Sequence, residues 1–313
     1  MSKRKEESMK YTENALNILT VRTYPKKGPA WIGTNLHGNE RIEELCRLLS
    51  TEKSTEKEEF LERRNKIEIE IKKMEGSVDG LVALGDASFP QPRGAVKPAD
   101  KPYALFYRGD ISLLQPSNLN IAVIGALNPD EKIEITERTV TQEILKHGAT
   151  IVSGLALGCD TIAHRTAVEN SAKTIAILPS PLNSIVPKEN IRLAELIVQR
   201  GGLLISEYYD KPKSKYDLVS RFVVRDRLQA LYSDAVLLSA SYAQNTQGND
   251  CGSRHALEKA KTYGIKRGVI YNELKHKTNP MYDLNRQLLQ EDKSVIRIDS
   301  SNMEESVLRL VRR

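Results

Sequence analysis

The sequence predicts an α/β protein with an extended, Rossmann-like, doubly wound and mostly parallel sheet, preceded by a small N-terminal helical domain. Two observations predict this fold. From about residue 80 onward, short apolar runs alternate with amphipathic segments of helix length, which is typical of βαβ units. The apolar runs are continuous, as expected for strands whose two faces are both covered by helices.

The expected strands follow one another along the chain at short intervals. They are predicted at 103–107, 120–125, 149–154, 173–178, 203–207, 235–240, 268–272 and 294–299. The amphipathic segments between them predict helices at 133–147, 160–171, 188–200, 219–233, 252–263 and 303–313. Three of these helices are followed by Gly148, Gly201 and Gly264, and glycine readily adopts the left-handed conformation that closes a helix.

The first residues differ in character from the rest of the chain. Residues 39–49 have the pattern of a short amphipathic helix, and 51–76 mixes both charge signs with sparse apolar positions. The mixed charges favour a solvated helix over a binding helix. We therefore predict a helical region at 1–78, a Rossmann domain at 79–275 and an extension at 276–313 made of the last strand and helix.

Composition excludes several classes of protein. The chain has 313 residues and a net charge of +6, which permits a polyanionic partner without requiring one. Its three cysteines are far apart and its five histidines form no HExxH pattern, so neither a metal nor a disulfide framework is expected. The charged first ten residues do not resemble a signal peptide, and no apolar run reaches the roughly 18 residues of a membrane span. We expect a cytoplasmic protein without a cofactor.

In doubly wound sheets, ligands bind outside the carboxyl ends of the strands, where the strand order reverses. Small residues recur at these positions, and backbone N–H groups at the helix starts that follow can face an anion. The turn at Gly125 and Ala126 has one glycine only, so it is not the GxGxxG fingerprint of a dinucleotide site. The other candidate turns are Ser153-Gly154 and the helix start at Gly252, Ser253 and Arg254.

The most basic segment of the chain is 211–227. Lys211, Lys213 and Lys215 precede a predicted helix that carries Arg221, Arg225 and Arg227. Arg225 beside Phe222 predicts phosphate contact and base stacking, because a guanidinium clamps phosphates and an aromatic ring stacks on bases. The alternative is that Arg225 and Asp226 pair with neighbouring residues within the fold.

Catalytic motifs are missing from the sequence. There is no nucleophile elbow and no GxxxxGK[ST] loop, so no catalytic residue is predicted. Asp160 is expected to cap the helix at 161–171 rather than act as a base. His164 is expected in the core, and Cys159 is expected to be a buried thiol.

Five stretches resemble the DNA-processing protein A family (DprA, also called Smf). They occur in the order typical of that family at 153–169, 174–190, 201–209, 222–233 and 252–264, and the resemblance covers about residues 80–275. It implies a non-enzymatic, dimeric protein that binds single-stranded DNA and loads a RecA-type recombinase during DNA uptake and recombination. It also implies DNA phosphate contacts around Gly125, Ser153, Gly154, Arg225, Arg227, Gly252 and Ser253, with Phe222 near the strand.

The sequence departs from the family pattern at several positions. Ala126 and Leu127 stand where the family usually has Ser or Thr and then Arg, and Leu157 stands where it has Lys or Arg. Asp226 replaces the Asn of an Arg-Asn-Arg motif, Cys251-Gly252-Ser253 replaces Gly-Ser-Gly, and no winged helix is expected after residue 300. Because affinity for nucleic acid depends on the number of phosphate contacts, these changes predict a divergent member.

Two other functions stay open at the level of the sequence. One is a Rossmann-type sensor or hydrolase of a nucleotide-derived small molecule. Related hydrolases use a PGGxGTxxE loop, whereas here Glu258 stands two residues late for that pattern. The other is a scaffold that acts through its helical N-terminus.

Overall fold

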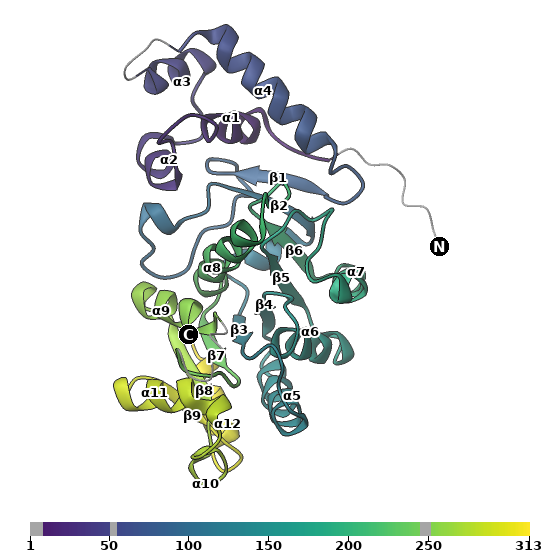
Figure 1. The fold of residues 1–313 in the computed structure, drawn as a ribbon, viewed down its shortest axis with the longest axis vertical. Helices are drawn as coiled ribbons and strands as arrows, with labels where there is room; N and C mark the ends of the chain where they lie inside the picture. The colour runs from purple at the N-terminus through teal and green to yellow at the C-terminus, as the bar shows by residue number, and fades with distance from the viewer. Residues whose placement is uncertain (1–8, 51–54, 245–251) are drawn as a thin grey trace.

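The computed structural model describes residues 9–50, 55–244 and 252–313, and within them the chain forms one nine-stranded sheet with helices on both faces (Figure 1). The strand order is β1-β2-β6-β5-β4-β3-β7-β8-β9. The strands from β3 to β9 are parallel to one another, and only β1–β2 and β2–β6 pair antiparallel. The predicted α/β, doubly wound and mostly parallel sheet is confirmed.

The strands are short and are flanked by helices at nearly every crossover. The strands are β1 (Gly80–Ala83), β2 (Ala104–Gly109), β3 (Asn120–Ile124), β4 (Thr150–Ser153), β5 (Thr174–Leu178), β6 (Leu203–Ser206), β7 (Ala235–Leu238), β8 (Lys266–Ile270) and β9 (Ile296–Ile298). The helices are α1 (Glu13–Val21), α2 (Pro29–Asn35), α3 (Ile42–Leu49), α4 (Lys57–Lys72), α5 (Glu131–Leu145), α6 (Cys159–Glu169), α7 (Ile191–Gln199), α8 (Lys215–Leu231), α9 (Ser253–Tyr263), α10 (Glu273–His276), α11 (Asp283–Glu291) and α12 (Met303–Val311).

Each strand and helix that was predicted with bounds is present, with ends that differ by a few residues. The largest extension is at α8, which begins at Lys215 instead of residue 219, because Ser214 caps it by accepting the N–H of Asp217. Strand β1 and helices α1, α2, α10 and α11 were not given bounds from the sequence. The glycines Gly148, Gly201 and Gly264 have positive φ, as their predicted role at helix ends requires.

Three apolar clusters hold the helices on the sheet. On one face, Ala122 and Ile124 belong to a cluster with α8, α9 and α11. On the other face, Ile121 and Val123 pack with α5, α6 and α12. The remaining cluster, on that second face, joins the β1–β2–β6–β5 end of the sheet to α7 and the N-terminal helices. Alternate residues of one strand therefore serve opposite layers, as a sheet buried on both faces requires.

The N-terminal helices share their core with the sheet. Leu16 of α1 and Phe60 of α4 lie in the same apolar cluster as Phe106 of β2 and Leu204 of β6. Lys10 also forms a parallel bridge to Gly80 at the start of β1. The helices α1–α4 thus extend one end of the molecule (Figure 1), and the predicted boundary near residue 78 crosses a continuous core.

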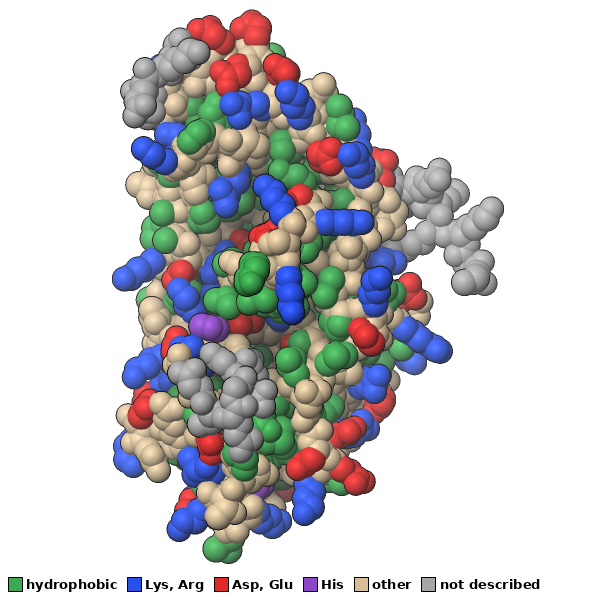
Figure 2. Space-filling view, viewed as in Figure 1, with side chains coloured by type: hydrophobic (Ala, Val, Ile, Leu, Met, Phe, Trp, Pro, Cys, Tyr) green, Lys and Arg blue, Asp and Glu red, His purple; other side chains and the backbone are tan. Residues whose placement is uncertain are grey.

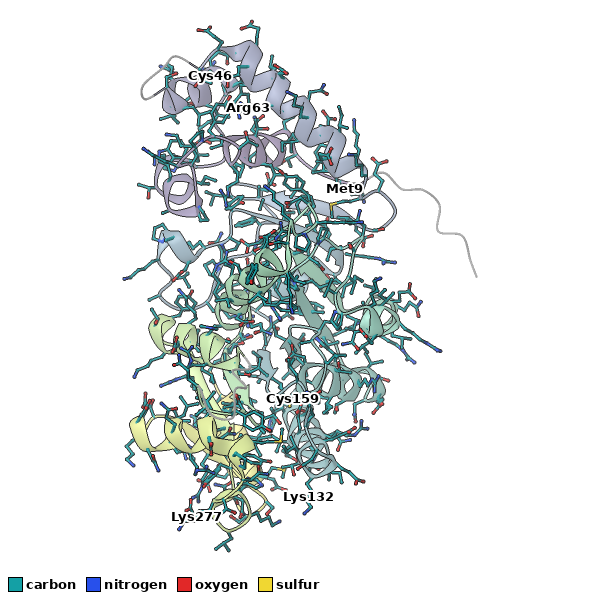
Figure 3. All side chains as sticks on the ribbon, in the orientation of Figure 1. Met9, Cys46, Arg63, Lys132, Cys159 and Lys277 are labelled. Carbon is teal, nitrogen blue, oxygen red and sulfur yellow. The ribbon has the colours of Figure 1, made fainter. Side chains whose placement is uncertain are left out.

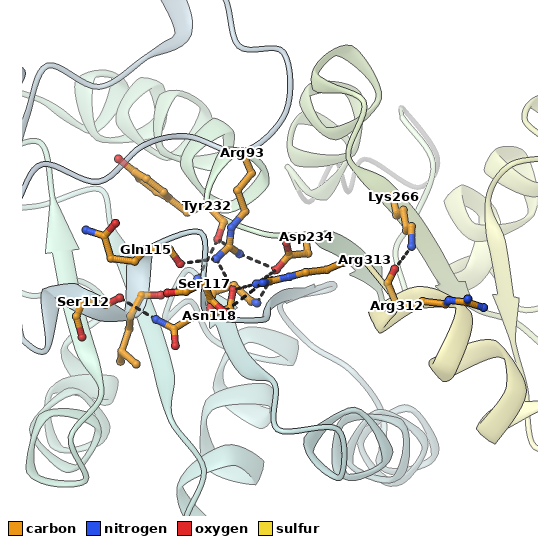
Figure 4. A network of polar contacts seen from close by, with 12 residues as sticks. Arg93, Ser112, Gln115, Ser117, Asn118, Tyr232, Asp234, Lys266, Arg312 and Arg313 are labelled. Carbon is orange, nitrogen blue, oxygen red and sulfur yellow. Dashed lines mark hydrogen bonds and ion pairs between the residues drawn. The ribbon is translucent and has the colours of Figure 1, made fainter.

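The C-terminal end is tied to the amino edge of the sheet (Figure 4). Arg313 donates hydrogen bonds to the carbonyls of Ser117 and Asn118 and pairs with Asp234. Buried Arg93 pairs with the same carboxylate at 2.9 Å, and Asp234 in turn accepts the N–H of Asn120, the first residue of β3. We call this set of contacts the amino-edge network.

The two cysteines in the described part of the chain lie far apart, Cys46 on α3 and Cys159 at the start of α6 (Figure 3). Both are free and buried, which confirms that Cys159 is a buried thiol. Cys251 lies outside the described residues. Within the described ranges, no helix is long and apolar enough to cross a membrane, and no group of His, Cys, Asp and Glu side chains could hold a metal ion.

Candidate nucleic-acid interface

A cavity of about 660 Å³ opens at the carboxyl edge of the sheet, beside α8. Strand β3 lies between β4 and β7 in the sheet. Strands β4 to β6 follow on one side of β3 and strands β7 to β9 on the other, so the direction in which strands are added reverses at β3. The cavity therefore lies at the switch point where doubly wound sheets bind their ligands. Its lining comes from the loops after β3 and β4, from α8 and from the start of α9, including Gly125, Ala156, Arg225, Gly252 and Ser253.

The cavity wall is mainly apolar. Leu127 and Leu157 contribute from the loops after β3 and β4, and Val219, Phe222 and Val223 contribute from α8. Four of these side chains are exposed and Phe222 is half-buried. In Figure 2, green apolar side chains gather over α8 in the middle of the visible face, with blue Lys and Arg side chains around them. Such a wall can cover the flat faces of bases.

The polar floor of the cavity is built around Arg225, which is only 4% exposed. Its Nη1 lies 3.9 Å from Oδ2 of Asp160, and its Nε lies 3.4 Å from Oδ1 of Asp226. The guanidinium also lies 5.6 Å from the centre of the Phe222 ring. Arg225 thus lines the cavity and also pairs with carboxylates of the fold, as the alternative expected, while its contact with phosphate stays a prediction.

Burial raises the pKa of both carboxyl groups beside Arg225. Desolvation raises the pKa of Asp226 to about 7, although Arg225 opposes the shift. Desolvation likewise raises the pKa of Asp160, again against the effect of Arg225. His164 is fully buried, with Nδ1 2.7 Å from Oγ1 of Thr174, and burial lowers its pKa to about 3. His164 therefore stays neutral in the core, as predicted.

Gly154 gives Arg225 its place against the backbone. A Cβ atom added at Gly154 would lie 1.2 Å from Nη1 of Arg225, so no larger residue fits while the arginine stays there. The N–H of Gly154 donates to Oδ2 of Asp160 at 3.0 Å. When the side-chain amide of Gln229 is oriented with its oxygen toward Gly154 and Arg225, that oxygen also accepts from the Gly154 N–H and from Nη1 of Arg225. The close approach of the arginine is thus sufficient to account for the glycine after β4.

Asp160 has a different partner from the one predicted. Helix α6 begins at Cys159 with Gly158 as its N-cap, so Asp160 stands inside the first turn. Its carboxylate accepts the N–H groups of Gly154 and Ala156 in the preceding loop. Asp160 therefore shapes the turn before the helix instead of capping the helix.

Four predicted phosphate-binding residues are held elsewhere by bonds within the fold. Ser153 is fully buried and its hydroxyl donates to the carbonyl of Val123 at 2.7 Å. The N–H of Ala126 donates to the carbonyl of Ala240. Arg227 is buried in a two-bond ion pair with Glu207, at 2.8 and 2.6 Å, and it also donates to the carbonyl of Asp100. These three and Gly154 lie outside the cavity lining, so the structure does not bring them to a ligand there.

The start of α9 completes the cavity. Gly252 is the N-cap in a left-handed conformation, and the Ser253 hydroxyl donates to the carbonyl of Gly125. Arg254, another predicted site residue, is not among the lining residues and pairs with Glu258 at 2.7 Å. Neither α6 nor α9 has a side-chain cap, and first-turn residues of both helices, Asp160 of α6 and Ser253 of α9, line this cavity. The partial positive charge of the two helix starts therefore lies beside it.

Sequence reasoning missed part of the lining. Val219, Val223 and Gln229 were not singled out, although they repeat at helical spacing with Phe222 and Asp226 on one face of α8. That spacing was a usable signal. Pro187 and His255 also line the cavity; both lie within the family-like stretches 174–190 and 252–264, but neither was named as a site residue.

A family model described as "DNA recombination-mediator protein A" matches residues 80–297, more than half of the chain. The chain belongs to this family. The resemblance inferred from the sequence is therefore confirmed, and the match runs from the first residue of β1 into β9.

Curated relatives match at moderate identity. Protein Smf of Escherichia coli K12 is 31% identical over 188 residues, which cover 60% of this chain and 48% of the relative. Protein Smf of Borreliella burgdorferi is 27% identical over 175 residues, which cover 55% of this chain and 53% of the relative. The chain spans about half the length of the curated relatives it matches.

Two solved structures share the fold. The X-ray structure of DNA processing protein A from Streptococcus pneumoniae superposes with a TM-score of 0.72 at 24% identity, over 97% of this chain and all of that chain. DNA processing protein A from Helicobacter pylori, described for its single-stranded DNA binding mode, gives a TM-score of 0.55 at 28% identity, over 71% of this chain and 98% of that chain.

Proposed function

We propose that the protein binds single-stranded DNA in the carboxyl-edge cavity, without catalysis, in DNA uptake or recombination. The observation that carries this proposal is the pairing of Arg225 with Phe222 in an apolar cavity flanked by two helix starts. Bases stack on the apolar wall, and phosphates face Arg225 and the starts of α6 and α9.

Family membership and the single-stranded DNA binding described for the Helicobacter pylori relative support this proposal. The interface that we propose includes Gly125, Phe222, Arg225, Gly252 and Ser253, and Arg254 follows them directly in the chain. Ala126, Ser153, Gly154 and Arg227 are left out because their polar groups are bonded within the fold. A homodimeric assembly, a RecA-type recombinase as partner and a cytoplasmic place of action belong to the same proposal.

The chemistry of the cavity predicts how binding responds to salt. Leu127 and Leu157 provide no cation, and two carboxylates offset the charge of Arg225. We therefore propose that stacking contributes more to affinity, and phosphate neutralisation less, than in a cavity lined by several lysines and arginines. The affinity should accordingly fall less steeply with salt concentration.

Fluorescence polarisation with labelled single-stranded DNA, duplex DNA and mononucleotides tests the proposal. Val223 and Val224 are adjacent on α8 and are each 41% exposed, but only Val223 lines the cavity. Val223→Glu should weaken single-stranded DNA binding at least tenfold, because a carboxylate then faces the bases and phosphates. Val224→Glu is the matched control and should change it little. Equal effects of the two variants would refute the proposed site.

A nucleotide-derived small molecule is the second candidate, because the cavity volume lies within the roughly 300–1,000 Å³ of small-molecule sites. Hydrolysis of such a molecule is disfavoured. Glu258, which stands two residues late for the PGGxGTxxE loop of related hydrolases, pairs with Arg254 through its carboxylate. Saturable mononucleotide binding together with no binding of oligonucleotides would favour this candidate, and release of the base would make it an enzyme.

A further inference from the structure

The segment before α8 carries three lysines that the cavity does not use. Lys211, Lys213 and Lys215 are all exposed, and in the part of the chain that the structure describes none of their ammonium groups has an ion-pair partner. The next residue, Tyr216, is 89% exposed. A large aromatic ring in water beside three unpaired cations calls for an explanation, since exposed apolar area is costly.

The two nearby carboxylates are already engaged. Arg221 is buried and pairs with Asp210 at 2.9 Å and with Asp217 at 3.1 Å. Asp217 also accepts the N–H of Lys213, while Ser214 caps α8 by accepting the N–H of Asp217. This reciprocal capping fixes the segment on the start of the helix. Asp217 also feels the charge of Lys213, but none of the three lysines forms an ion pair among the described residues.

Tyr216 continues the cavity-lining face of α8. Tyr216, Val219 and Val223 follow at spacings of three and four residues, so they form one stripe on the helix surface. Val219 and Val223 line the cavity, and all three side chains are exposed. The stripe therefore runs without interruption from the first turn of α8 into the cavity.

We propose that this stripe and the three lysines form an outer subsite that receives single-stranded DNA leaving the cavity. Tyr216 stacks on a base, and Lys211, Lys213 and Lys215 neutralise the phosphates beside it. This inference rests on the proposed function, since it extends the same strand beyond the cavity.

The dimensions agree with a short extension. Six residues separate Tyr216 from Phe222, which is about 9 Å along a helix at 1.5 Å per residue. That length holds two or three stacked bases at roughly 3.4 Å each. An oligonucleotide too short to leave the cavity therefore does not reach Tyr216, whereas a strand of 15 nucleotides does.

Charge decides between DNA and a protein as the occupant. An apolar stripe alone would suit a protein partner equally well. Three lysines without acidic partners complement a polyanion, and an exposed aromatic ring beside cations is the combination used for single strands. We therefore assign the stripe to DNA, and a protein occupant becomes one outcome of the test.

The test measures affinities of labelled oligo-dT of 15 and of 2 nucleotides by polarisation, across a series of salt concentrations. Tyr216→Ala should weaken binding of the 15-mer about fivefold or more, because loss of one stacked base costs at least about 1 kcal/mol. Binding of the dinucleotide, which is too short to reach Tyr216, should be unchanged. Tyr216→Phe should retain wild-type affinity, because the ring stacks and the hydroxyl does not.

The triple variant Lys211→Ala/Lys213→Ala/Lys215→Ala should reduce the salt slope for the 15-mer by about 2, at roughly 0.7 per phosphate contact of a single strand. Its matched control is Lys275→Ala/Lys277→Ala/Lys293→Ala, which changes three exposed lysines that lie between β8 and β9 in the chain. The control has the same net charge change and should alter the slope much less. Equal slopes in the two triple variants would overturn the inference.

The outcomes separate the inference from the proposed function. If wild-type protein binds neither oligonucleotide, the proposed function fails. If it binds the 15-mer and Tyr216→Ala binds equally well, only the outer subsite fails. If Tyr216→Ala leaves DNA affinity intact but changes the oligomeric state in light scattering, the stripe is a protein interface, and the inference is wrong.

Discussion

The two edges of the sheet each hold a buried arginine with aspartate partners, but the two arginines are bonded differently. At the amino edge, Arg93 donates to Asp234 at 2.9 Å and to the carbonyls of Tyr232, Gln115 and Asn118 (Figure 4). At the carboxyl edge, the carboxylates nearest to Arg225 lie 3.4 and 3.9 Å away, and the guanidinium faces a cavity.

This difference separates a structural arginine from a binding one. Short bonds on both Nη atoms leave Arg93 little capacity for a ligand, and they join β3, β7 and the chain around Gln115. At Arg225 the one short bond goes to the neutral amide oxygen of Gln229, and the contacts with the two carboxylates are longer, so a phosphate can compete for the guanidinium. Loss of Arg93 should therefore affect folding, whereas loss of Arg225 should affect binding.

The largest expected effect is on stability at the amino edge. Arg93→Ala takes the main partner from half-buried Asp234 and the donor from the carbonyls of Tyr232, Gln115 and Asn118, and should lower the free energy of unfolding by about 3 kcal/mol. Chemical denaturation measures this loss. Arg313→Ala removes the more exposed partner of the same carboxylate and is the control, with an expected cost of about 1 kcal/mol or less. Similar losses in both variants would contradict the structural role of Arg93.

The next largest effect is on the affinity for single-stranded DNA at the carboxyl edge. Arg225→Ala should weaken single-stranded DNA binding by about 10- to 100-fold, corresponding to a charge-assisted hydrogen bond of roughly 1.5–3 kcal/mol. Gly154→Ala reaches the same group indirectly, because its Cβ takes the position of Nη1 of Arg225. It should weaken binding as well. Circular dichroism confirms that each variant is folded, and a folded Arg225→Ala protein with full affinity would remove Arg225 from the site.

The pKa of Asp226 predicts a dependence on pH. Because burial raises this pKa to about 7, the carboxyl gains a proton as the pH falls from 8 to 6, and the negative charge beside Arg225 disappears. A bound phosphate favours the neutral form further, so binding takes up a proton and affinity should rise severalfold over this range.

Asp226→Asn removes this titration. The variant should bind single-stranded DNA more tightly than wild type at pH 8 and show little change between pH 8 and 6. Polarisation at both pH values measures the effect. A wild-type affinity that is flat across this range would exclude Asp226 from the interface.

The smallest expected effect comes from adding a cation. Leu157→Arg places a guanidinium on the cavity wall and should tighten binding a few-fold, with a salt slope steeper by about 0.7 for one new phosphate contact. Leu274→Arg adds the same charge to an exposed position on α10 and should leave the slope nearly unchanged. Equal slopes would indicate a general effect of net charge.

The sequence predicted the parallel core of the fold because continuous apolar strands and helix-ending glycines depend on local physics. It did not predict β1, whose four residues become a strand only by pairing with β2. It also placed a domain boundary near residue 78, because the shared core of α1, α4 and β2 depends on contacts between segments far apart in the chain.

The candidate site was predicted in outline for a similar reason. Arg225, Phe222 and Gly252 belong to motifs that sequence shows directly, and the structure brings them to one cavity. Whether a backbone N–H is available to a ligand depends on contacts between distant parts of the chain, which the sequence does not show. Gly154 looked like a phosphate-binding glycine, but its N–H is taken by Asp160, and Arg227 looked like a second clamp, but Glu207 holds it.

Hydrogen–deuterium exchange with and without a 15-nucleotide single strand tests the central claim most directly, because it maps both edges of the sheet in one measurement. Bound DNA should slow amide exchange at 124–127, at 156–160 and along α8 from Tyr216 to Gln229. Exchange at 112–118, beside the amino-edge network, should not change. Protection confined to the amino edge, or to α1–α4, would contradict the assignment of the carboxyl-edge cavity as the DNA site.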